Sequence, residues 1–153
     1  MLVEHESIIS QVFCDIMEKL TFMFGEELGI DELYPEGDTY HIVTISFSGF
    51  KKGNLSLIVP EGMAGEIAAN VLGVSDTDER TLTLAIDSLK EVVNVLCGKI
   101  LTELEGENPI FNLSVPEVKN IKEKEWEKYL QDDEYLAFNV DGFNVLLDFK
   151  IED

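Results

Sequence analysis

The hydrophobic patterns of the chain predict an α+β fold, an antiparallel sheet built from hairpins with three helices packed on one face. Apolar residues recur at helical spacing over three segments, residues 2–25, 61–73 and 81–105. Alternating patterns rich in β-branched and aromatic residues form two adjacent pairs, residues 40–47 with 53–60 and two runs within 135–151. Strands joined by such short connections pair antiparallel, so the helices are left to cover the sheet.

Composition indicates a single globular domain over residues 1–153, because 45% apolar residues suffice to bury one core. The formal charge of −20 repels phosphate backbones and anionic lipids, which argues against nucleic-acid and membrane-surface roles. The N-terminus is acidic where a signal peptide is basic, and no apolar run approaches the roughly 20 residues that span a bilayer. We therefore expect a cytoplasmic protein.

The first half of the chain predicts a helix, a loop and a hairpin. Residues 2–25 form one amphipathic pattern, with two glycines near its end. The segment 31–38 contains Pro35 and Gly37 and is typical of a loop. The two alternating runs that follow are joined by the sequence SGFKKG and indicate a β-hairpin.

Two helices are expected next. Residues 61–73 have the small and apolar spacing of a short helix that ends at a glycine. The acidic loop VSDTDER follows, and its candidate N-caps for the next helix are Ser75, Asp76 and Asp78. The third helical pattern then continues to about Glu105.

The last third of the chain predicts a strand and a terminal hairpin. The sequence GENP ends the long helix, and the following residues indicate a strand up to Pro116. The segment KEKEWEKYLQ fits either a short charged helix or an irregular edge segment. Two alternating runs around Asp141 and Gly142 give the strongest hairpin signal in the chain.

Common catalytic signatures are absent, since the chain contains no GxGxxG, GxxxxGK or GxSxG sequence. His5 and His41 have no ligands at zinc-site spacing, and we interpret both as surface or loop histidines. Cys14 and Cys97 lie in separate helical patterns, so we expect small buried hydrophobes and no disulfide. Cys97 has no partner that makes it a nucleophile. We expect no metal site and no cofactor in this chain.

The long third helix carries a narrow polar strip opposite its apolar face. The expected core residues are Leu89, Val92, Val93, Leu96 and Ile100. Asp87, Glu91, Asn94 and Gly98 are spaced by four, three and four residues, so they share an arc of roughly 60° that faces solvent.

A plain solvated face is the first interpretation of this strip, because polar residues on a helix exterior need no function. Two residues favour a binding face instead. Asn is a weak helix former, and a glycine in mid-helix costs roughly 1 kcal/mol relative to alanine. Gly98 also thins the helix and allows another backbone or side chain to approach.

The spacing of Asp87, Glu91 and Asn94, with Pro116 after the helix, resembles the signature of the CheX/CheC phosphatases of bacterial chemotaxis. The surrounding sequence GNLSLIVPEGMAGEIAANVLG is similar to the strand and helix upstream of that motif, and FNLSVP is similar to the strand after it. The resemblance extends from about Tyr40 to Ile151.

The resemblance implies a phosphatase that hydrolyses the aspartyl phosphate of a CheY-like response regulator. Glu91 would pair with the regulator's active-site lysine, and Asn94 would enter its phosphorylation site. Mg²⁺ would belong to the regulator. Asp87 and Pro116 would have supporting, structural roles.

The resemblance also implies one site per chain and a homodimer joined through sheet edges, as in the CheX-like branch. The first helical segment has no Glu followed three residues later by Asn, so the doubled motif of CheC-like members is absent. Val93 stands where the family often has a glycine.

The chemistry of the side chains agrees with these roles. A carboxamide has no useful basicity, so Asn94 can contribute only by holding a water in line with phosphorus. Glu91 can accept a lysine ammonium and fix the docking register. Two alternatives remain, a noncatalytic domain that binds a response regulator or signalling partner, and a structural dimer module unrelated to phosphotransfer.

Overall fold

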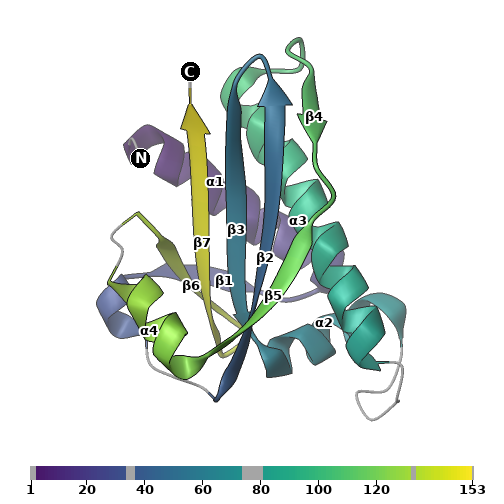
Figure 1. The fold of residues 1–153 in the computed structure, drawn as a ribbon, viewed down its shortest axis with the longest axis vertical. Helices are drawn as coiled ribbons and strands as arrows, with labels where there is room; N and C mark the ends of the chain where they lie inside the picture. The colour runs from purple at the N-terminus through teal and green to yellow at the C-terminus, as the bar shows by residue number, and fades with distance from the viewer. Residues whose placement is uncertain (1–2, 34–36, 74–80, 132–133, 153) are drawn as a thin grey trace.

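The computed structural model describes residues 3–33, 37–73, 81–131 and 134–152. In chain order its elements are α1 (Val3–Ile16), η1 (Met17–Thr21), β1 (Gly25–Leu28), η2 (Ile30–Glu32), β2 (Thr39–Gly49), β3 (Lys52–Pro60), α2 (Glu61–Leu72), α3 (Thr81–Glu105), β4 (Phe111–Leu113), β5 (Glu117–Lys122), α4 (Glu123–Leu130), β6 (Leu136–Val140) and β7 (Phe143–Glu152). The predicted α+β class is confirmed (Figure 1).

One seven-stranded sheet forms the centre of the molecule, in the order β1-β6-β7-β3-β2-β4, with β5 also paired to β2. Every strand pair is antiparallel, as predicted. Helices α1, α2 and α3 lie against one face of the sheet, and their apolar residues share one buried cluster with it (Figure 1). No helix among the described residues is long and apolar enough to cross a membrane.

The first helix is shorter than predicted. Regular α-helix ends at Ile16, and a π-helical turn carries the chain to Thr21, whose hydroxyl donates to the Met17 carbonyl at 2.6 Å. Phe22 then adopts a left-handed conformation with φ of 60° and ends the helix. Because this conformation is usually taken by glycine, the sequence carried no signal for the stop.

The segment after this stop is a strand that the sequence did not predict. Residues Gly25–Leu28 form β1, which pairs with β6 at the edge of the sheet. The sequence GEEL lacks the β-branched and aromatic residues that mark a strand, so this strand forms because β6 offers unpaired backbone groups beside it.

Both predicted hairpins are confirmed. Strands β2 and β3 pair from Tyr40–Pro60 to Phe47–Gly53, and the connection narrows to two residues between Gly49 and Lys52. Gly49 has φ of 135°, and a Cβ there would lie 2.5 Å from the Ile110 carbonyl oxygen, so the position requires glycine. Asp141 and Gly142 both have positive φ in the β6–β7 turn, as the Asp-Gly signal indicated.

Helices α2 and α3 have the predicted extents, and the core prediction for α3 is confirmed. The predicted core residues are all buried, namely Leu89, Val92, Val93, Leu96 and Ile100. The candidate N-caps in the loop before α3 lie outside the described residues.

The region after α3 contains two short strands and a helix. β4 ends at Leu113, and a further strand, β5, begins after Pro116 and pairs with the same strand, β2. The sequence EVKNIK is too charged to predict this strand. The undecided segment forms a helix, α4, which packs with β2 and β5 on the other face of the sheet.

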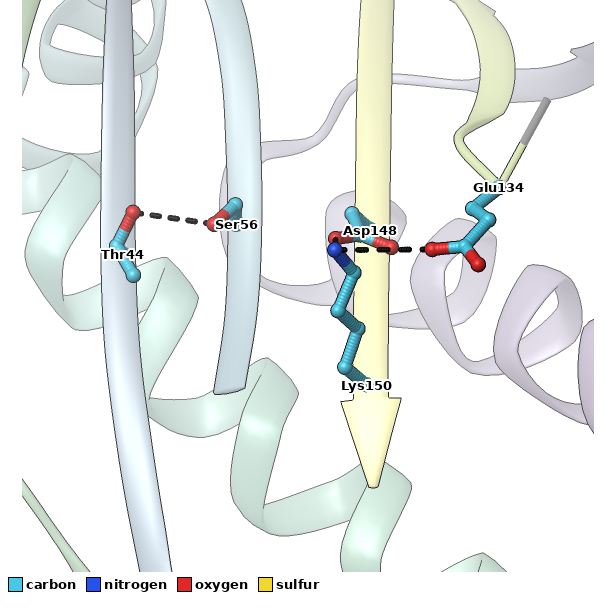
Figure 2. A network of polar contacts seen from close by, with 5 residues as sticks. All are labelled: Thr44, Ser56, Glu134, Asp148 and Lys150. Atoms are coloured by element: carbon cyan, nitrogen blue, oxygen red, sulfur yellow. Dashed lines mark hydrogen bonds and ion pairs between the residues drawn. The ribbon is translucent and has the colours of Figure 1, made fainter. Parts of the chain in front are cut away.

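The second face of the sheet is half apolar and half polar. Trp126 of α4 is fully buried there and stacks on Tyr40 at 4.9 Å between ring centroids. Figure 2 shows the polar half, where the hydroxyls of Thr44 and Ser56 lie 3.1 Å apart. On β7, Lys150 lies 3.6 Å from the buried Asp148 carboxylate and 3.6 Å from Glu134 (Figure 2).

Replacing Trp126 with alanine is expected to lower the free energy of unfolding by about 3–5 kcal/mol, because it empties the only fully buried site on α4. Denaturant unfolding followed by far-UV circular dichroism measures this change. Glu127→Ala, an exposed change on the same helix, is the matched control and should alter stability by no more than about 0.5 kcal/mol. Equal stability of Trp126→Ala and the native chain would contradict this account of α4.

Candidate functional site

The polar strip of α3 faces outward, as its spacing predicts. Burial of the opposite face against the sheet sets the rotation of the helix about its axis. Asp87, Glu91 and Asn94 are exposed, and Gly98 is half-buried. These positions follow one another along a single edge because their separations nearly complete whole helical turns.

Glu91 and Asn94 have no partners within the described part of the chain. No hydrogen bond or ion pair joins either side chain to another described residue, and the same holds for Asp87. A carboxylate and a carboxamide, one helical turn apart and solvated, offer acceptors for a cation and both donor and acceptor groups for a water. The arrangement therefore leaves both side chains accessible to another molecule.

Gly98 leaves an opening at the C-terminal end of the strip. A Cβ at this position would meet no atom within 4 Å apart from its chain neighbours and the backbone of its own helix, so packing inside the chain does not require glycine there. A shallow groove of about 180 Å³ lies beside it, lined by Gly98, Leu101, Thr102, Gly106, Glu107, Pro109, Phe111 and Leu113. The glycine thus adjoins free space between α3 and β4.

Pro116 lies between the two short strands that pair with β2. The link is held on its β4 side by Ser114, whose backbone N–H donates to the Ser46 carbonyl at 2.8 Å. The Ser114 hydroxyl accepts from the Ser46 N–H at 2.9 Å. Pro116 has no backbone N–H, which suits a position where strand pairing is interrupted.

A second groove adjoins the strip on its N-terminal side, and no sequence pattern predicted it. It has a volume of about 280 Å³ and is lined by Leu20, Val71, Leu72, Leu84, Asp87, Ser88, Glu91 and Val92. Its apolar residues come from three separate segments, so no local spacing relates them. The one sequence signal is the pair Val71–Leu72, two large apolar residues directly before the glycine that ends α2.

The cysteines are free, as predicted, and Cys97 is fully buried while Cys14 is half-buried. Burial raises the pKa of the Cys97 thiol to about 12, so it stays protonated at neutral pH and is a poor nucleophile. Burial, and then the charges of Asp15 and Glu27, raise the pKa of Cys14.

The prediction that His41 is a surface or loop residue is wrong. His41 is 2% exposed within β2, and its Nδ1 lies 2.6 Å from the side-chain oxygen of Asn120 on β5. Its place in the alternating strand puts it on the same face as Val43 and Ile45, which are buried. No cluster of three or more metal-ligating side chains occurs among the residues that the structure describes.

Comparisons with known proteins identify a family and a shared fold. The sequence model of the family described as chemotaxis phosphatase CheX matches residues 41–137. No curated protein sequence matches the chain significantly.

Among solved structures, CheX from Desulfovibrio desulfuricans has a TM-score of 0.71 at 14% identity, with 98% of this chain and 100% of that chain covered. CheX from Vibrio vulnificus has a TM-score of 0.70 at 17% identity, covering 98% and 97%. A CheX-CheY-BeF3-Mg²⁺ complex from Borrelia burgdorferi has a TM-score of 0.66 at 16% identity, covering 99% and 100%. At these identities the structural matches establish the fold alone.

Proposed function

The chain belongs to the CheX family of chemotaxis phosphatases, and we propose that it hydrolyses the aspartyl phosphate of a CheY-like response regulator. The observation that carries this proposal is the pair Glu91 and Asn94, exposed on one edge of α3 and unpartnered within the described residues. A surface that must enter another protein's active site needs side chains free of its own contacts.

Asn94 is the group that we assign to the attacking water. A carboxamide accepts a hydrogen bond from a water through its oxygen and can donate one through its nitrogen, which fixes the water's position without removing a proton. The water oxygen forms a bond to phosphorus while the bond to the aspartyl oxygen breaks. The products are inorganic phosphate and a carboxylate, a leaving group stable enough that no strong base is needed.

Glu91 is the group that we assign to docking. It precedes Asn94 by three residues, so both side chains reach the same region of a partner. A lysine ammonium of the regulator would pair with this carboxylate and hold Asn94 in register with the phosphoryl group. Asp87 lies one turn before Glu91 on the same edge, Pro116 shapes the link between β4 and β5, and the open space at Gly98 admits the partner's backbone.

The metal of the reaction would belong to the partner. The similar CheX from Borrelia burgdorferi forms a complex with CheY, BeF3 and Mg²⁺. We therefore expect the phosphorylated regulator of this chain to carry Mg²⁺ itself, where the cation offsets phosphoryl charge. This chain would contribute Asn94 and Glu91 and no cofactor.

We also propose a homodimer joined through sheet edges. The edge formed by β4 and β5 is the better candidate, because Ile110 and Val115 beside it are each 80% exposed. The opposite edge, β1, carries Glu26 and Glu27, whose like charges oppose edge-to-edge pairing.

Replacing Asn94 with alanine should slow regulator dephosphorylation by about tenfold to a thousandfold, or about 1.4–4 kcal/mol of transition-state stabilisation. Phosphate release from a phosphorylated regulator measures the rate, and binding should change little because the lost contact is to water. Asn108→Ala, at an exposed carboxamide after α3, is the matched control. If the native chain does not accelerate the regulator's own dephosphorylation, the noncatalytic binding domain is favoured instead.

Replacing Glu91 with glutamine should weaken regulator binding by about tenfold, since it removes one charge-assisted pair and keeps the side-chain shape. The affinities of the native chain and of Glu91→Gln for the regulator should be measured at low and at high ionic strength. At high ionic strength the two affinities should differ less, because salt screens the pair between Glu91 and the lysine. Glu103→Gln lies on the same helix, in an ion pair with Lys99 at 3.3 Å, and should leave binding unchanged. Equal affinity of Glu91→Gln and the native chain for the regulator would contradict the docking role of Glu91.

Light scattering after size exclusion should give a molar mass twice that of the 17.2 kDa chain. Val115→Lys should shift the protein to monomer, because it places charge at the proposed edge. Phe24→Lys, a 66% exposed apolar residue next to β1, is the control and should leave the dimer intact. Monomeric native protein, or dissociation by Phe24→Lys alone, would refute this dimer.

A further inference from the structure

The groove on the N-terminal side of the polar strip has an apolar surface that is exposed in the chain. Val71 is 41% exposed and Leu72 is 48% exposed, at the last turn of α2. Leu20 of η1, with Leu84 and Val92 of α3, completes the apolar part of its lining. Water against such a surface is released when a partner covers it, so the groove favours binding of an apolar group.

The walls of the groove are held in place before any partner arrives. The Asn70 side-chain amide donates to the Thr21 carbonyl at 3.1 Å and ties the end of α2 to η1. The Gly73 backbone N–H donates to the Ala69 carbonyl and closes the helix. A surface formed in advance loses little conformational freedom on binding, which raises the affinity it can provide.

The charge of the groove restricts the chemistry of its partner. Asp87 and Glu91 line it from α3, and no lysine, arginine or histidine is among the lining residues that the structure describes. Neither carboxylate is paired with another described residue. The groove therefore combines an apolar surface with two free negative charges, and it complements an apolar side chain that is flanked by cations.

The groove is continuous with the proposed reaction site. Glu91 belongs to both, and Asn94 follows it by one turn on the same helix edge. A partner that occupies the groove therefore lies next to the proposed position of the phosphoryl group at Asn94. A phosphorylated receiver domain whose lysine pairs with Glu91 would bring its neighbouring surface over Val71, Leu72 and Leu84.

We propose that this groove is the docking surface that selects the response regulator, an inference that rests on the proposed phosphatase function. The matching regulator presents an apolar side chain to Val71 and Leu72, and a second basic residue to Asp87. These contacts lie away from the reacting atoms and are equal in the ground and transition states. They set the affinity for one regulator over another and leave the chemical step unchanged.

The test compares the double variant Val71→Ser/Leu72→Ser with the control Phe50→Ser. Phe50 is 64% exposed in the β2–β3 turn, at the opposite end of the molecule from α2 (Figure 1). Two measurements are made with receiver domains from the same organism. One is the affinity for a domain activated by beryllofluoride and Mg²⁺, and the other is phosphate release from the phosphorylated domain. Circular dichroism checks that each variant folds.

The double variant should bind at least about tenfold more weakly than the native chain and show a raised KM with an unchanged kcat. Asp87→Asn should also weaken binding, with the loss shrinking at high salt. Phe50→Ser should match the native chain in both assays. Native-like affinity of the double variant, or a lowered kcat at unchanged KM, overturns the docking surface.

The two assays separate this inference from the proposed function. Groove-dependent binding without any acceleration of phosphate release would refute the phosphatase and retain the docking surface. Normal hydrolysis and normal binding by the double variant would refute the docking surface alone. A native chain that binds none of the receiver domains would overturn both.

Discussion

Burial of one face of α3 against the sheet is the constraint on which the candidate site depends. Leu89, Val93 and Leu96 are fully buried in the cluster that the helix shares with the sheet. Successive residues of a helix differ by about 100° in direction, so this packing leaves a single rotation of α3 available. Turning it by one residue would move either Lys90 and Asn94 or Glu91 and Lys99 into core positions, and burying such groups without partners costs much free energy. The core therefore orients Glu91 and Asn94 toward solvent.

Neighbouring contacts hold that helix along its length. At its C-terminal end Glu105 pairs with Lys51 of the β2–β3 turn at 2.9 Å, and both side chains are largely buried. Toward its N-terminal end it packs against α2, whose last turn is tied to η1. A site on a rigid helix keeps its geometry when a partner approaches, as positioning of a water requires.

The electrostatics of the chain divide into a long-range and a local effect. A net charge of −20 opposes the approach of any anionic partner over long distances. At close range, Asp87 and Glu91 present negative charge beside an apolar surface, which suits a partner with cations next to its own anionic pocket. In the docking surface that we propose, short-range contacts determine which protein is recognised, and salt reduces the long-range repulsion.

The sequence by itself determined the elements whose signal is local: the period of α3 and its polar strip, and the turn at Asp141–Gly142. Only the tertiary structure decided the rest. β1 and β5 are strands because β6 and β2 supply backbone partners, although the sequences GEEL and EVKNIK favour no strand. Likewise, Leu20, Leu72 and Leu84 meet at one groove although they are far apart in sequence. Periodicity reports on neighbouring residues, whereas strand pairing and groove formation depend on contacts between distant ones, which no local pattern encodes.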